Sequence, residues 1–92
     1  MPASSLTRAF AALADTTRLQ LYSLLLKHRN ICVTELAHSA HISIAAASQH
    51  LQILEQAGFI IRERQGQKVC YCTHTDTPLV RSLVKLINQY KP

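Results

Sequence analysis

Few glycines, few acidic residues and no long apolar run distinguish this sequence, and each shortage argues against a class of protein. Two glycines among 92 residues are too few for a Gly-rich phosphate loop or for an oxyanion or cofactor cradle. There is also no Cys-x-x-Cys motif. No apolar run approaches the roughly 18 residues of a membrane span, and residues 9–13 lack the pattern of a secretory signal. We therefore expect neither an enzyme nor a membrane protein.

The charge and the apolar content point to two kinds of partner. Ten Lys and Arg against five Asp and Glu give a formal net charge of +5, which attracts polyanions: nucleic acid is the first candidate and an anionic membrane surface the second. A 48% hydrophobic fraction with 16% charged residues is high for one domain over residues 1–92 and predicts contact with another subunit. Three cysteines, an odd number without a secretion signal, predict reduced thiols in the cytoplasm.

Hydrophobic spacing predicts a mainly α chain with one small β-hairpin. Apolar residues recur at intervals of three and four in the helical segments and alternate in the strands. The order of the elements is that of a winged helix-turn-helix with an additional helix at each end. The predicted elements are helices over 4–13 and 16–27, a strand over 31–33, a helix from Thr34 to before Ile42, a helix over 43–57, strands over 59–64 and 69–73 joined by a Gln65-Gly66 turn, and a helix over 77–90.

The helix predicted over 43–57 has one face of short, uncharged or hydrogen-bonding side chains. Ser43 is a good N-cap, and Gly58 ends the helix. Such a face can approach base edges: Gln49 suits a bidentate contact with adenine, and cations on the hairpin suit phosphates or a narrow minor groove. The predicted DNA-binding residues are Ser43, Ala45, Ser48, Gln49, His50, Gln52, Arg62, Arg64 and Lys68.

Some of these predicted DNA-binding residues also have simpler explanations. Gln49 and Gln52 also suit an ordinary solvated helix face, and the hairpin cations also suit a role in solubility alone. His50 flanks the apolar stripe, so a packed histidine hydrogen-bonded to backbone explains it as well as a phosphate contact does. The stripe itself is predicted to consist of Ile44, Ala47, Leu51 and Leu54.

The first and last predicted helices each have an apolar stripe. The rest of so small a chain leaves nothing to cover the stripe of the last helix, which therefore suits a dimer interface. The stripes consist of Leu6, Phe10 and Leu13 in the first helix and of Leu79, Leu83, Leu86, Ile87 and Tyr90 in the last.

Four segments spread over nearly the whole chain form a specific combination. They are Leu13-Ala14-Asp15-Thr16-Thr17-Arg18-Leu19, Cys32-Val33-Thr34-Glu35-Leu36-Ala37, Ser43 to Leu54 with Ser48-Gln49-His50-Leu51, and Gly58-Phe59-Ile60 through Gly66-Gln67-Lys68-Val69-Cys70-Tyr71. Together they resemble the ArsR-type (ArsR/SmtB) metal-responsive repressors. The resemblance implies a bacterial transcriptional repressor that forms a homodimer through helices 4–13 and 77–90 and leaves its operator when an inducer binds. The two recognition helices of such a dimer should read an inverted repeat on double-stranded DNA.

The chain departs from that family at the metal sites. Members that sense arsenic or cadmium have Cys-Val-Cys where this chain has Cys32-Val33-Thr34, and Ala37 stands where arsenic sensors often have a further cysteine. Members that sense zinc use Asp and His pairs on the last helix, where this chain has only His74 and Asp76 at the start. We expect neither of these metal sites.

The three cysteines predict a different sensor site. In a winged helix the strand over 31–33 pairs with the second hairpin strand. All three cysteines then face outward on one small sheet if the alternate residues face the core, namely Ile31, Val33, Val69 and Tyr71. Neighbouring Cβ atoms there lie about 4.5 to 5.5 Å apart, which suits As(III) or another thiophilic metal ion, or a disulfide under oxidation. The alternative is three small residues at β-prone positions. The predicted sensor residues are Cys32, Cys70 and Cys72.

These features predict a homodimeric DNA-binding repressor. Its operator affinity is expected to fall on binding a thiophilic metal or metalloid or on thiol oxidation, and it requires no cofactor. The alternatives are a winged-helix protein-interaction module and a constitutive DNA-binding protein without an inducer site.

Overall fold

The computed structural model describes residues 3–90, and within them it confirms the predicted order of helices, hairpin and last helix. One correction concerns Val33, which begins a helix instead of ending a strand. The elements are α1 (Ala3–Leu13), α2 (Thr16–Lys27), β1 (Ile31–Cys32), α3 (Val33–Ala40), α4 (Ile44–Gln56), β2 (Ile60–Gln65), β3 (Lys68–Thr73) and α5 (Pro78–Gln89).

The core is centred on α2, as its apolar sequence predicts. Asp15 caps this helix, its side chain accepting a hydrogen bond of 2.9 Å from the Arg18 backbone N–H. Tyr22 is fully buried and packs edge-on against Phe59, with ring centroids 5.2 Å apart. Burial raises the pKa of Tyr22 to about 12. The aromatic pair thus joins α2 to the start of the hairpin.

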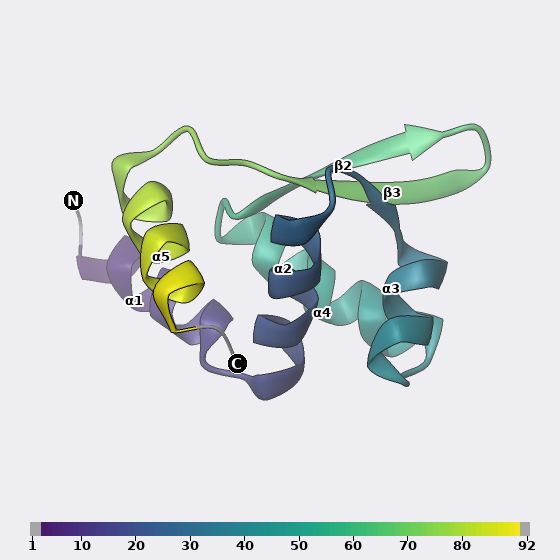
Figure 1. Ribbon diagram of the computed structural model, residues 1–92, viewed down its shortest axis with the longest axis horizontal. Coiled ribbons are helices and arrows are strands. Elements are labelled where there is room, and N and C mark those ends of the chain that lie inside the picture. The colour runs from purple at the N-terminus through teal and green to yellow at the C-terminus, as the bar shows by residue number, and fades with distance from the viewer. Residues whose placement is uncertain (1–2, 91–92) are drawn as a thin grey trace.

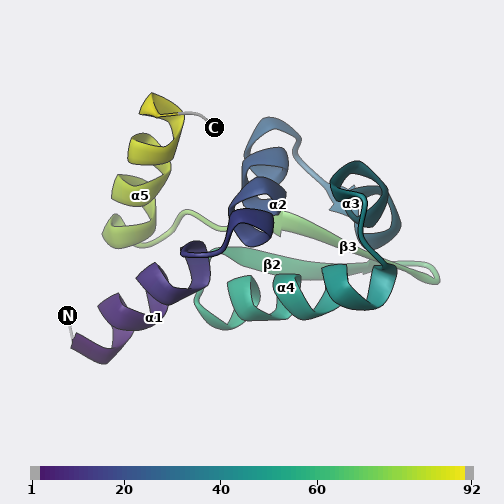
Figure 2. The same cartoon turned by 90° about the horizontal axis from the view of Figure 1, so that it is seen from below.

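The three strands form an antiparallel sheet in the order β1-β3-β2. Ile31 pairs with Tyr71 and Cys32 with Cys70, which confirms the predicted contact of β1 with β3. The hairpin turns at residues 66–67, where Gly66 adopts a φ of 64° that favours glycine. The sheet lies along one side of α2 and α4, and the turn of the hairpin projects beyond them (Figures 1 and 2).

The pair α3 and α4 forms the helix-turn-helix. The Ser43 hydroxyl caps α4 by accepting a 3.0 Å hydrogen bond from the Ala46 N–H. The prediction for Ile44 is wrong: this residue is 52% exposed, because the first turn of α4 extends beyond the core. The rest of the predicted stripe is fully buried and consists of Ala47, Leu51 and Leu54.

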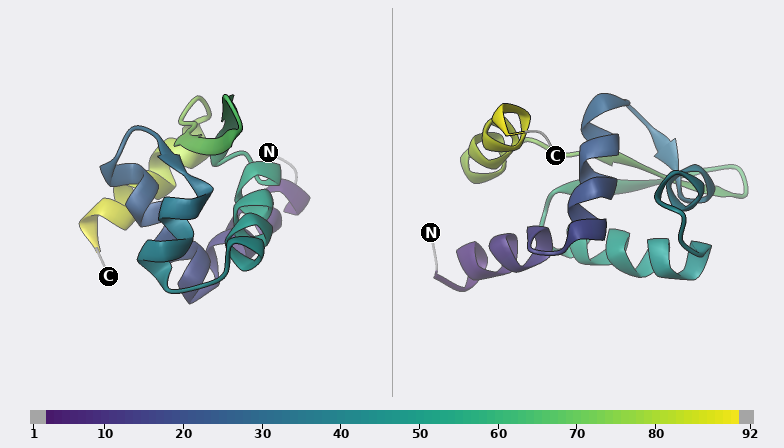
Figure 3. Two further views of the ribbon diagram at one scale, coloured as in Figure 1. Left: turned by 90° about the vertical axis from the view of Figure 1, so that its right-hand side faces the viewer. Right: turned by 60° about the horizontal axis from the view of Figure 1, so that its bottom comes forward.

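The helices α1 and α5 lie at the end of the molecule opposite the hairpin turn (Figure 3). They expose much of their apolar surface, with Phe10 at 53% and Leu86 at 50%. The buried side of α1 is formed by the small residues Ala9 and Ala12. Of the predicted stripe, Leu6 and Phe10 are exposed and Leu13 is half-buried. Within residues 3–90 no helix is long and apolar enough to cross a membrane.

Candidate nucleic-acid interface and cysteine pair

The outer face of α4 is exposed and uncharged. Ala45, Gln49 and Gln52 are all exposed, while Ser48 and His50 are half-buried at its flanks. Ile44 extends the exposed surface at the start of the helix. Since its side chains are short, the backbone of α4 can come close to base edges, and its two amide side chains can donate and accept hydrogen bonds there.

Cations line the hairpin beside α4. Arg62 and Arg64 lie opposite Tyr71 and Val69 and therefore share their face of the sheet, and Lys68 lies nearer the turn. All three cations are exposed. Among residues 3–90, no ion pair involves any of them. Their charges are thus available for phosphate oxygens.

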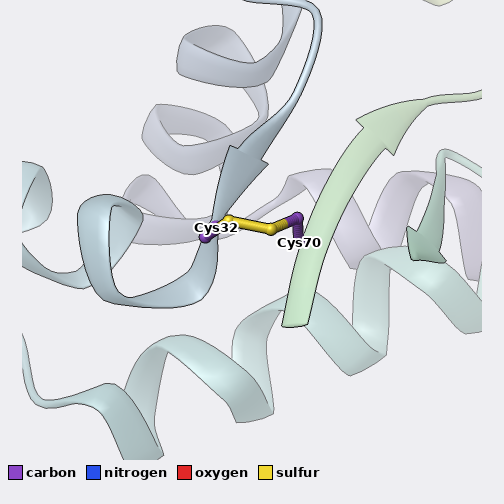
Figure 4. Close-up of a disulfide and its surroundings, with 2 residues drawn as sticks. All are labelled: Cys32 and Cys70. Atoms are coloured by element: carbon purple, nitrogen blue, oxygen red, sulfur yellow. A yellow bond between two sulfur atoms is a disulfide. The ribbon is translucent and has the colours of Figure 1, made fainter. Parts of the chain in front are cut away.

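Two of the three cysteines are joined to each other. Figure 4 shows the disulfide between Cys32, at the end of β1, and Cys70 in β3. Cys32 is also the N-cap residue of α3, so the bond connects the first helix of the helix-turn-helix to the hairpin. Cys70 is 0% exposed, which corrects the expectation that it faces outward. β3 is the central strand of the sheet and is also contacted by α2 and α3, so neighbouring elements cover that position.

The third cysteine does not join this pair. Cys72 has a free thiol, and its Sγ donates a hydrogen bond of 3.3 Å to Glu63 Oε1. Burial first, and then the hydrogen bond and charge of Glu63, raise the pKa of the Cys72 thiol. A protonated thiol is a weak ligand and nucleophile. The described part of the chain holds no group of three His, Cys, Asp or Glu that fits a metal ion, so the predicted three-sulfur cluster is not assembled here.

A polar cluster joins α1, α2 and α4, and its central member is Arg18, which is not among the predicted site residues. Its Nε donates to the Ala12 carbonyl at 2.7 Å and its Nη2 to the Ala11 carbonyl at 3.2 Å. Its Nη1 lies 3.3 Å from His50 Nδ1 and 3.9 Å from Asp15 Oδ2. His50 is thus packed against a side chain instead of backbone. The signal was that Arg18 and His50 belong to two of the segments that resemble one family.

Comparisons with known proteins agree with this architecture. Residues 15–62 match the model of the bacterial regulatory proteins of the arsR family. The sequence is 38% identical to the arsenic resistance transcriptional regulator ArsR1 of Pseudomonas putida over 75% of this chain and 54% of that protein. The chain spans about half the length of the first curated relatives it matches. These relatives are named as transcriptional regulators and not as enzymes.

Solved structures agree as well. HlyU from Vibrio cholerae has a TM-score of 0.83 and 26% identity, covering 97% of this chain and 94% of that chain. The reduced form of HlyU has a TM-score of 0.82 at the same identity, over 97% and 90% of the two chains. Mb0332 from Mycobacterium bovis, a homodimeric winged helix-turn-helix DNA-binding domain, has a TM-score of 0.81 and 26% identity over 95% and 78%.

Proposed function

This chain belongs to the arsR family of bacterial regulatory proteins and has a winged helix-turn-helix fold, and on that premise we propose that it is a homodimeric repressor that binds double-stranded DNA in the cytoplasm. One observation carries the proposal: the uncharged, exposed face of α4 lies beside a hairpin whose cations form no ion pair within residues 3–90. In this arrangement α4 enters the major groove and specifies bases, while the hairpin contacts phosphates or the adjacent minor groove.

The exposed apolar surface of α1 and α5 supports the homodimer. Phe10 and Leu86 are each at least half exposed, and a second copy of the chain would remove them from water. Two-fold symmetry then presents two copies of α4 to one side of DNA. We expect an inverted repeat whose half-sites lie about 34 Å apart, near one helical turn.

The experiment that tests DNA binding uses a fragment from the upstream region of the protein's own gene, with unrelated DNA as competitor. Each phosphate contact contributes about −0.9 to the slope of log K against log salt. Arg64→Gln should therefore make the slope shallower by about that amount, whereas Arg29→Gln, which removes the same charge from the exposed turn before β1, should not. If the wild-type protein binds no DNA specifically, the alternative of a protein-interaction module takes its place.

A second proposal, regulation by the state of the cysteines, is favoured by the disulfide between Cys32 and Cys70. Hydrogen peroxide would oxidise the two thiols: the S–S bond forms, the peroxide O–O bond breaks, and the two thiol protons leave in two molecules of water. The bond then ties the start of α3 to β3, whereas the reduced thiols leave α3 and the hairpin free to adjust to DNA. A coupling of about 1 to 3 kcal/mol would lower the operator affinity of the oxidised form roughly 5- to 150-fold.

Serine variants separate this mechanism from its alternatives. Oxidation should release DNA from the wild-type protein and from Cys72→Ser, the matched control, but not from Cys32→Ser or Cys70→Ser. The same variants are then titrated with As(III) in the reduced state, because two thiolates can also bind a thiophilic ion. Release by As(III) that disappears in Cys32→Ser would identify an ion as the inducer. DNA binding that ignores both agents would leave a constitutive DNA-binding protein.

A further inference from the structure

We propose that Arg18 is a positioning residue that fixes α4 relative to α1. It lies in the first turn of α2, between the helix that exposes apolar surface and the helix with the uncharged outer face. Its guanidinium contacts backbone oxygens of α1 and a side chain of α4 at the same time.

The link to α1 satisfies the end of that helix. The last carbonyls of a helix have no partner within it, and α1 has no basic residue in its last turn. Arg18 supplies a donor to the Ala12 carbonyl and a second donor to the Ala11 carbonyl, which also accepts from the Ala14 N–H at 3.3 Å. It also brings a positive charge from the following helix. A cation at the negative end of a helix dipole is stabilising. The guanidinium is therefore held in place on the α1 side by two hydrogen bonds and by charge.

The link to α4 ends on His50. A guanidinium can only donate hydrogen bonds, so the contact of 3.3 Å requires Nδ1 of His50 to be unprotonated and to accept. The Arg18 side chain is only 15% exposed, so water competes little for these contacts. A planar group with several fixed donors defines the orientation of its partners, which the single flexible ammonium of a lysine does not.

Packing alone defines the orientation of α1 weakly. α1 contacts both α2 and α4, but its buried residues are Ala9 and Ala12. Alanine methyl groups interlock little with a neighbouring helix, so helices packed on them can shift with small loss of contact. Hydrogen bonds with fixed directions then decide the angle. In the proposed function, on which this step rests, α1 belongs to the dimer interface and α4 to the DNA interface. By fixing α4 relative to α1, Arg18 would therefore set the spacing between the α4 helices of the two protomers.

A distance measured within one chain tests the link without DNA. Nitroxide-bearing amino acids replace Arg8 in α1 and Gln52 in α4, both exposed, and labelled chains are diluted with unlabelled ones. The wild-type background should give one narrow distance distribution. Arg18→Gln should broaden it, and Arg29→Gln, which removes the same charge elsewhere, should leave it narrow. Equal widths in folded wild-type and Arg18→Gln protein overturn the proposal.

His50→Ala gives a second route if Arg18→Gln does not fold, as judged by circular dichroism. It removes the acceptor on α4 and leaves both hydrogen bonds to α1. The distance distribution should broaden again, and a narrow one overturns the proposal. Arg18→Lys keeps the charge but not the fork of donors, so it should resemble Arg18→Gln; a full rescue by lysine would show that charge alone acts.

DNA binding tests the consequence. Arg18→Gln should lower the affinity for the inverted repeat by at least about fivefold, the lower end for coupling between distinct parts of a protein. The salt slope should not change, because Arg18 contacts no phosphate; a slope shallower by about 0.9 would make it a phosphate contact and overturn the proposal. Unchanged affinity with a broadened distance also overturns it. If the wild-type protein binds no DNA, the proposed function fails, and the distance measurement alone decides the link.

Discussion

The helices α4 and α5 have similar amphipathic sequences but differ in how far the chain covers their apolar stripes. They have 13 and 12 residues, and each begins with a hydroxyl N-cap, Ser43 or Thr77. The apolar stripe of α4 is buried within the chain, and Leu51 is 0% exposed. In the apolar stripe of α5 only Leu83 is buried. Leu79 and Ile87 are half-buried, and Leu86 is half exposed.

This difference separates two kinds of surface. The core of the chain already covers the buried stripe of α4, so the opposite face of that helix is free for a polar partner. The stripe of α5 is only partly covered within residues 3–90, and its exposed remainder suits a second apolar surface. An amphipathic pattern in a sequence shows that a helix has an apolar side, and only the packing shows whether the same chain or another one covers it.

The largest expected effect concerns the covered stripe. Leu51→Ala should lower the free energy of unfolding by about 2 to 5 kcal/mol, because it leaves a cavity in the core. Leu86→Ala is the matched control and should cost far less at a protein concentration where the chain is monomeric, since the side chain is already half in water. Urea denaturation followed by circular dichroism measures both. Similar losses would contradict the contrast between the helices.

Next in size is the effect of a charge on the uncovered stripe. Fully burying a leucine contributes about 1.5 to 3 kcal/mol. Leu86 is already half covered in the monomer, so Leu86→Glu removes about half of that amount, twice in a symmetric dimer. The dimer dissociation constant should therefore rise at least about tenfold. Lys85→Glu, one residue earlier and outside the stripe, should change it much less. Sedimentation equilibrium measures both constants, and an unchanged constant for Leu86→Glu would remove α5 from the interface.

The outer face of α4 is expected to contribute specificity. Gln49→Ala removes a bidentate donor and acceptor, so discrimination at one base pair should fall by about 1 to 3 kcal/mol. Gln56→Ala removes the same side chain from the exposed last position of the helix and is the matched control. Competition between operator fragments that differ at single positions measures the loss. A uniform loss across all fragments would indicate a contact without sequence information.

The smallest expected effects come from the two N-caps. Ser43 accepts from the Ala46 N–H at 3.0 Å and Thr77 from the Val80 N–H at 3.3 Å. Replacing either residue by alanine should lower stability by about 0.5 to 2 kcal/mol. Ser43→Ala should act on the monomer, whereas Thr77→Ala should act mainly on the dimer, because α5 belongs to the proposed interface. Denaturation of both variants at two protein concentrations distinguishes the two effects. If the losses of stability in Ser43→Ala and Thr77→Ala depended equally on protein concentration, the assignment of one to the monomer and the other to the dimer would be wrong.

Local patterns were sufficient to predict the elements and much of their faces. The spacing in α4, its Ser43 cap and the stop at Gly58 depend on residues close in sequence, and the structure confirms them. The pairing of β1 with β3 followed from topology, because a short strand before a helix-turn-helix has one place in the sheet. Ile44 was misplaced because periodicity does not show where along a helix the core ends.

The family, the helical order and the net charge were determined by the sequence itself, because they depend on residue identity and on spacings of a few residues. The tertiary structure decided which side chains bond to one another. Strand pairing already predicted Cys32 beside Cys70, but only the structure joins these two in a disulfide and leaves Cys72 hydrogen-bonded to Glu63 instead. It also places Arg18 against His50, 32 positions apart. Contacts of that length depend on how complete helices pack, and no local spacing encodes the result.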